Sequence, residues 1–346
     1  MSQSTAPIGY LELGQQRRTH ALSRTGGFLR TLARRKPMGF AALLFIVLMV
    51  VVAAFPTAFA THDNPGATNV APRFQNYCLG PTDTFLCPTT VEKSQLTGDR
   101  TVAGSTSQPF GTDSAGHDNF SRVVFGARWA LYVGVGAMLI STSLALFIGM
   151  TSGYFLGKYD AFVQRVVDAV MALPTLVVLL ALPAMIGKVD LDGPLPFDEP
   201  SITFFKLVVI LGVLGGAGGS RVIRASVISV RSAQYLDAAR TIGARDRRIM
   251  IRHVLPNIFG ALMVQATISL GGLILAEAAL SFLGFGVVDP NKPTWGQMLN
   301  RAQQVASVHP WQAIWPGLFI ALAVFSFNML GDALRDVLDP RLRGSR

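Results

Sequence analysis

The sequence contains little charge. Asp, Glu, Lys and Arg make up only 14% of its 346 residues, whereas about 25% is usual in a soluble domain. Hydrophobic residues make up 50% of the chain. This composition excludes an ordinary water-soluble domain and indicates a membrane protein.

The common signatures of catalysis are also missing. The two Gly-Lys pairs, Gly157-Lys158 and Gly187-Lys188, lack both the following Ser or Thr and the earlier glycine of a phosphate-binding loop. There is no His-Glu-x-x-His, no Gly-x-Ser-x-Gly and no dinucleotide fingerprint, and the five histidines are dispersed. We therefore expect this chain to have no enzyme activity, no metal site and no cofactor of its own.

Six apolar runs are long enough for membrane-spanning helices, because about 20 helical residues cross the hydrocarbon layer. They cover residues 38–60, 129–157, 163–187, 203–220, 258–286 and 311–331. They predict an all-α polytopic membrane protein with six transmembrane helices. The first run has an alternative interpretation as a cleavable signal peptide that ends at Ala58-Phe59-Ala60, but the long polar region before it favours a retained span.

The positions of Lys and Arg predict the orientation of these spans. With the N-terminus in the cytoplasm, 21 of the 30 Lys and Arg residues fall in cytoplasmic segments. Both termini are then cytoplasmic. The predicted segments are a cytoplasmic segment 1–37, a first span 38–60, an extracytoplasmic segment 61–128, a five-helix core 129–331 that contains the loop 221–257, and a cytoplasmic tail 332–346.

Cysteine is scarce. Cys78 and Cys87 are the only two, and both fall in the predicted extracytoplasmic segment, with Gly80 and Pro81 between them. A turn there can bring the thiols together, and an oxidising compartment favours a disulfide. The alternative is a pair of free or buried thiols.

Glycines, prolines and two acids interrupt the apolar runs. Gly149, Gly153 and Gly157 recur four apart, as do Gly212 with Gly216 and Gly215 with Gly219; this spacing lets helices pack closely. Pro174 and Pro183 predict kinks in the third run.

Asp168 and Glu277 are acidic residues within predicted apolar spans. Insertion of a charged side chain into the membrane costs free energy, so each residue is expected to have a structural or functional role. For Asp168 the alternatives are an interfacial residue with a partner and a role in transport. For Glu277 they are a hydrogen bond between helices and a place on a solute path.

A basic segment separates the fourth and fifth runs. Residues 234–257 contain five arginines, at 240, 245, 247, 248 and 252. Ala238, Ala239 and Ile242 recur at helical spacing, and Gly243 permits a bend. The pattern predicts two short helices with a glycine corner. Anionic lipid is an adequate partner for the arginines, but it does not explain the small residues at the bend.

This segment resembles a known motif. It begins with Asp237-Ala238-Ala239. Gly243 follows after three intervening residues, and Leu255-Pro256 follows after eleven more. This pattern is similar to the "EAA" loop of permease subunits of bacterial ABC importers. Asp237 stands where that family has Glu, and His253 where many members have Ile. The resemblance implies that the loop docks into a cytoplasmic ATPase through the following residues: Asp237, Ala238, Ala239, Arg240, Gly243, Ala244, Leu255 and Pro256.

Three further stretches resemble the dipeptide, oligopeptide and nickel group of these permeases, and in particular the second subunit of the pair. They are residues 110–128, 280–299 and 331–343. In the first, Phe110, His117 and Phe125 stand where that group has Leu, Arg and Tyr. The resemblance does not extend to residues 61–109.

The resemblance implies an ABC importer permease fold in the bacterial inner membrane and import of peptides by alternating access. The implied partners are a homologous permease, two ATPase subunits that bind the ATP, and an extracytoplasmic solute-binding protein, besides membrane lipid; no nucleic acid is expected. Two alternatives remain at this point: an ion-coupled secondary transporter that uses Asp168 and Glu277, and a membrane scaffold or receptor that transports nothing.

Overall fold

The computed structural model describes residues 36–67, 90–92, 100–102, 109–174, 177–181, 199–287, 289–307 and 309–338. This part of the chain is almost entirely helical, which confirms the all-α class. The exception is an antiparallel pair of three-residue strands, β1 (Thr90–Glu92) and β2 (Arg100–Val102), in which Thr90 lies opposite Val102. The sequence did not predict this hairpin. Cys78 and Cys87 lie outside the described residues.

Five helices of the described part are long and apolar enough to cross a membrane. They contain α2 (Pro37–Ala54), α4 (Asn119–Phe155), α7 (Glu199–Arg231), α10 (Leu255–Phe282) and α12 (Trp311–Leu338). The predicted third span, 163–187, is not among them. Its first half lies in α5 (Gly157–Ala172), which ends just before Pro174, and residues 182–187 lie outside the described part.

Two of these helices extend well beyond their apolar runs. α4 begins ten residues before the predicted span because Asp118 caps its N-terminus, accepting hydrogen bonds from the backbone N–H groups of Phe120 and Ser121. α7 has 33 residues, a length of about 50 Å. A hydropathy pattern locates the lipid-facing part of a helix and not its ends, so the sequence predicted both α4 and α7 to be shorter than they are.

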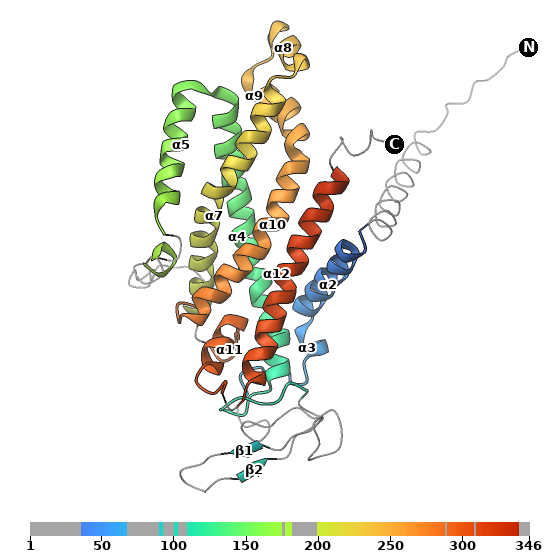
Figure 1. Ribbon diagram of the computed structural model, residues 1–346, viewed down its shortest axis with the longest axis vertical. Coiled ribbons are helices and arrows are strands. Elements are labelled where there is room, and N and C mark those ends of the chain that lie inside the picture. Colours follow the sequence, from blue (N-terminus) through green and yellow to red (C-terminus); the bar gives the residue numbers. More distant parts are fainter. Residues whose placement is uncertain are drawn as a thin grey trace, which may run out of the picture.

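The long helices run along a common direction (Figure 1). At one end lie two short helices, α8 (Gln234–Thr241) and α9 (Asp246–Ile249), and a π-helical turn, η1 (Met250–Val254), joins α9 to α10. At the opposite end lie α3 (Pro56–Phe59), α11 (Trp295–Ala302) and the hairpin. The basic loop and the long predicted outer segment are therefore at opposite ends of the bundle, as the charge pattern predicts.

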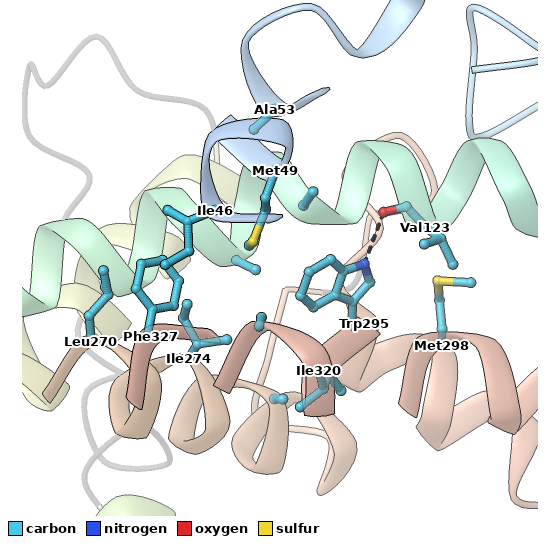
Figure 2. Packing of buried hydrophobic residues seen from close by; sticks show 14 residues of the cluster. Ile46, Met49, Ala53, Val123, Leu270, Ile274, Trp295, Met298, Ile320 and Phe327 are labelled. Carbon is cyan, nitrogen blue, oxygen red and sulfur yellow. Dashed lines mark hydrogen bonds between the residues drawn. The ribbon is translucent and has the colours of Figure 1, made fainter. Parts of the chain in front are cut away.

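The largest buried side chain, Trp295, joins several helices (Figure 2). It extends from α11 into a cluster that includes Met49 of α2, Ile274 of α10 and Phe327 of α12. Its indole Nε1 donates a hydrogen bond of 2.9 Å to the carbonyl oxygen of Val123 on α4. A buried indole N–H needs such an acceptor. The first span is thus packed into the same core as the other helices.

Helices α4 and α7 pack closely through glycines. A Cβ on Gly149 would lie 2.6 Å from the carbonyl oxygen of Ser220, and one on Gly153 would lie 2.9 Å from that of Arg224. Gly212 and Gly216 of α7 are equally close to side chains of α4. The predicted role of these four glycines is confirmed. Gly157 differs, because it has a φ of +63° and open space around it at the break between α4 and α5.

Candidate functional site

The basic loop forms two short helices with a corner at Gly243, as predicted. α8 ends at Thr241, and Gly243 follows in the left-handed region with a φ of +80°, a conformation that glycine adopts without strain. The N–H of Ala244 donates to the carbonyl oxygen of Ala239 at 3.1 Å, which closes the end of α8. α9, η1 and α10 then continue as one helical segment that contains Leu255 and Pro256.

One face of this loop is buried against the ends of the long helices. Leu236 and Ile249 have no exposed surface and Ala239 only 7%. These three residues belong to a cluster with Tyr154 of α4 and Val227 of α7, among others. The loop is therefore anchored in the bundle. Ala239, predicted as a contact residue, lies on this anchoring face.

The opposite face protrudes from the bundle. Ile242 is 85% exposed, the Asp237 side chain is 69% exposed, and Ala238 is exposed. Nothing lies within 4 Å of the place where a Cβ on Gly243 would stand. Asp237, Ala238, Ile242 and Gly243 thus form an accessible surface with an apolar centre, which we call the knob. The sequence analysis placed Ile242 on a helix but did not predict that its side chain would be exposed.

Polar contacts tie the loop to α4. The Tyr154 hydroxyl donates to Asp246 Oδ1 at 2.6 Å. The guanidinium of Arg240 lies 5.6 Å from the centre of the Tyr154 ring, and its Nη1 donates to Asp237 Oδ1 at 3.0 Å. Arg240 is thus engaged within the loop.

A charged pair beside the loop joins α7 to α5. Arg224 forms a two-pronged ion pair with the carboxylate of Asp160, and its Nε donates to Oδ1 at 2.7 Å. The hydrogen bond from Arg224 lowers the pKa of Asp160 from its ordinary value, although burial opposes this. Bidentate pairs of this kind fix orientation as well as charge.

The two predicted acidic candidates have different surroundings. Asp168 forms an ion pair with Arg221 of α7, and both side chains are about half exposed, so the predicted partner exists. Glu277 is 1% exposed and accepts a hydrogen bond of 2.7 Å from the Ser281 hydroxyl of its own helix. The hydrogen-bond partner of Glu277 is therefore within α10, and a bond from Glu277 to another helix is not observed in the described part of the chain.

A second polar cluster lies at the opposite end, where two of the recognised stretches, 110–128 and 280–299, are found. Asp113 accepts from the backbone N–H of His117 at 2.9 Å and faces His117 Nδ1 at 2.7 Å. Arg122, 1% exposed, lies 3.5 Å from the same carboxylate. Burial alone raises the pKa of Asp113, but the hydrogen bond from His117 and the charge of Arg122 outweigh it and lower the pKa below its ordinary value. Sequence reasoning recognised residues 110–128 as a motif but did not assign these contacts.

This cluster joins distant parts of the chain. Gly126 lies against the Trp295 ring, since a Cβ there would be 2.6 Å from its Cδ1, and the Gln312 amide donates to the carbonyl oxygen of Thr112 at 3.4 Å. Residues 110–128, the start of α11 and the start of α12 therefore meet in one place. We call this arrangement the lock; it holds the helix ends opposite the knob together.

An apolar cavity of about 260 Å³ lies between α5, α7 and α10. Its lining includes Met171, Leu214, Gly215 and Leu273, and no charged side chain is among the lining residues. Neither Asp168 nor Glu277 lines it.

A bundle of membrane-length helices with an anchored, protruding loop at one end defines a polytopic membrane protein with an accessible surface on that loop. The chain belongs to the family of binding-protein-dependent transport system inner membrane components, whose model matches residues 145–344. It is a transmembrane permease subunit of an ABC transporter, and membership implies a partner permease and ATPase subunits.

Curated relatives cover most of the chain. The dipeptide transport system permease protein DppC of Bacillus subtilis (strain 168) is 36% identical over 266 residues, which are 77% of each chain. The glutathione transport system permease protein GsiD of Escherichia coli O157:H7 is 32% identical over 311 residues, 90% of this chain and 89% of the relative. A solved structure of the MetNI methionine ABC transporter, in inward-facing conformations, matches 62% of this chain and 96% of its own with 15% identity and a TM-score of 0.45, a likeness too slight to support an argument.

Proposed function

We propose that this permease subunit imports di- or oligopeptides and that its knob docks into a cytoplasmic ATPase. The observation that supports docking is that one face of the loop is buried in the bundle while the opposite face is exposed. Leu236, Ala239 and Ile249 anchor it in the bundle, while Asp237, Ala238 and Ile242 protrude. An exposed apolar residue at the end of a rigid, anchored helix is suited to insert into a groove of another protein.

The proposed direction of transport and the partners follow from the family and from the charges. The knob end carries the arginines of the loop, so the rule for positive charges places it and both termini in the cytoplasm. An extracytoplasmic solute-binding protein then delivers the solute at the end that holds the lock. The arginines at 245, 247, 248 and 252 also suit anionic lipid at the inner surface.

Peptide is the proposed solute class because DppC is named as a dipeptide permease and GsiD as a glutathione permease, and glutathione is itself a tripeptide. The apolar cavity beside α7 agrees with a path that makes few specific contacts and leaves the selection of the solute to the binding protein. Titration of the partner binding protein with dipeptides, tripeptides and a nickel chelate tests this: saturable binding of a peptide is expected, whereas exclusive binding of the chelate excludes it.

The docking role is tested by adding bulk to the knob without straining its backbone. We expect Ala238→Trp to abolish co-purification of the ATPase and uptake while the protein inserts normally. Ser229→Trp, which adds the same bulk near the end of α7 outside the knob, should leave both unchanged. Replacement of Gly243 by a bulky residue is a second test of the docking role. This variant adds backbone strain as well as bulk, because Gly243 has a positive φ.

If Ala238→Trp leaves ATPase binding and uptake at the level of the Ser229→Trp control, the knob is not the binding site for the ATPase.

A further inference from the structure

The structure shows how a movement of the knob can reach the membrane-spanning helices. The loop 234–254 has two arms, α8 before the glycine corner and the α9–η1 segment after it. Gly243 has no side chain and open space around it, so side-chain packing does not hold the corner itself. Contacts outside the corner must connect both arms to the bundle if docking is to move it.

Tyr154 occupies that position. It lies in the last turn of α4, 92 residues before Asp246 in the sequence, and is 3% exposed. Its hydroxyl donates to Asp246 on the second arm at 2.6 Å, and Arg240 of the first arm lies over its ring at 5.6 Å. One side chain of α4 thus contacts both arms.

The surrounding contacts make this connection stiff. Tyr154 packs in the same cluster as Leu236 of α8 and Ile249 of α9. Gly153, the residue before Tyr154, and Gly149, five residues before it, bring α4 against the backbone of α7. A displacement of the loop that moves Tyr154 therefore moves α4, and with it α7.

We infer that Tyr154 is the positioning residue that joins both arms of the loop to α4 and transmits the movement of the docked knob to the transmembrane helices. The inference rests on the proposed docking of the knob. The ring and the hydroxyl of Tyr154 have different roles. The ring provides packing, which a phenylalanine would retain. The hydroxyl holds the second arm through its hydrogen bond to Asp246, which a phenylalanine would lose.

The test uses the assembled importer in inside-out vesicles with Leu214→Cys as a reporter. Leu214 lines the apolar cavity beside α7, and inside-out vesicles expose the cytoplasmic face of the importer to an added membrane-impermeant maleimide. ATP with vanadate should change the labelling rate of this cysteine. We expect Tyr154→Phe to reduce that change at least several-fold, with ATPase co-purification and basal ATP hydrolysis retained. A residue with a merely structural role would lower co-purification or expression together with the response.

Tyr159→Phe is the matched control, because the Tyr159 hydroxyl donates only to Thr151 in an exposed position; its response should equal that of the parent. Asp246→Ala is the second variant, because an asparagine would keep an oxygen that can accept the hydrogen bond. If the hydrogen bond is the link, Asp246→Ala and Tyr154→Phe each reduce the response, and the double variant is no worse than the poorer single one.

A full ATP response in Tyr154→Phe overturns the inference and leaves the docking role intact. Loss of the response in Tyr154→Phe that adds fully to the loss in Asp246→Ala also overturns it, because the two residues then act separately. If the parent itself shows no response to ATP while Ala238→Trp still binds the ATPase, the proposed docking has failed, and the inference fails with it.

Discussion

At the scale of single residues, Asp113 shows how a buried charge is maintained. Its carboxylate faces His117 Nδ1 at 2.7 Å and the guanidinium of Arg122 at 3.5 Å. Removal of one member of a buried pair leaves the other without compensation and costs about 3–5 kcal/mol. We expect Asp113→Asn to lower thermal stability in detergent clearly, while Asp332→Asn, at an exposed position of α12, has little effect.

The same carboxylate predicts a dependence of stability on pH. Because the pKa of Asp113 is lowered in the folded protein, its contribution is fully present above the unfolded pKa of about 4 and is lost as the pH falls through the folded pKa. Unfolding measured from pH 7 to pH 3 should show a loss of stability concentrated below about pH 4. Asp113→Asn should flatten that part of the curve. An unchanged slope in this variant would show that other carboxylates cause the acid sensitivity.

Residue contacts were the least predictable level. The resemblance to the "EAA" loop singled out Asp237, Ala238 and Gly243 in the sequence, and the structure places all three at an accessible surface. It did not separate Ala239 from Ala238, because a helical period over so short a segment does not say which face meets the bundle. The contact between Tyr154 and Asp246 joins residues 92 apart, and nothing local in the sequence specifies such a pairing.

At the scale of elements, close packing of α4 against α7 depends on glycine. Gly149→Ala would place a methyl group 2.6 Å from the backbone oxygen of Ser220, which no side-chain rotation can relieve. We expect a destabilisation of about 1–3 kcal/mol, seen as a lower melting temperature in detergent. Gly272→Ala is the control, because nothing lies within 4 Å of its added methyl group on α10. Equal stability of the two variants would contradict the packing role.

The elements themselves were predictable where an apolar run is long and uninterrupted. Five of the six predicted runs correspond to helices of membrane-crossing length in the described residues. The third run, 163–187, contains Pro174 and Pro183, and α5 ends at Ala172. Hydropathy does not register such a break, because proline removes a backbone donor without making the run polar.

At the scale of the whole molecule, the two ends of the bundle are built differently. One end carries the knob, with Gly243 at its corner and the exposed side chain of Ile242. The other carries the buried lock of Asp113, His117 and Arg122 around the start of α4. Under the proposed function the knob receives the ATPase, while the lock holds the helix ends at the opposite side together.

The two ends of the predicted extracytoplasmic segment lie close together. Thr61 donates to Asp118 Oδ2, and the N–H of His62 donates to the Ser121 hydroxyl at 2.9 Å. Residues that follow α3 are therefore hydrogen-bonded to the first turn of α4. Both ends of the segment lie at the end of the bundle opposite the knob, so we predict that Cys78 and Cys87 lie on that side of the membrane.

This placement leads to the last prediction. In an oxidising compartment we expect Cys78 and Cys87 to be bridged. An impermeant maleimide added to spheroplasts should label the protein only after reduction, and Cys78→Ser should be labelled without reduction because it frees the partner thiol. Labelling of the unaltered chain before reduction would show free thiols on the outer side. Labelling confined to inside-out vesicles would instead reverse the orientation of the whole bundle and place the knob away from any cytoplasmic ATPase.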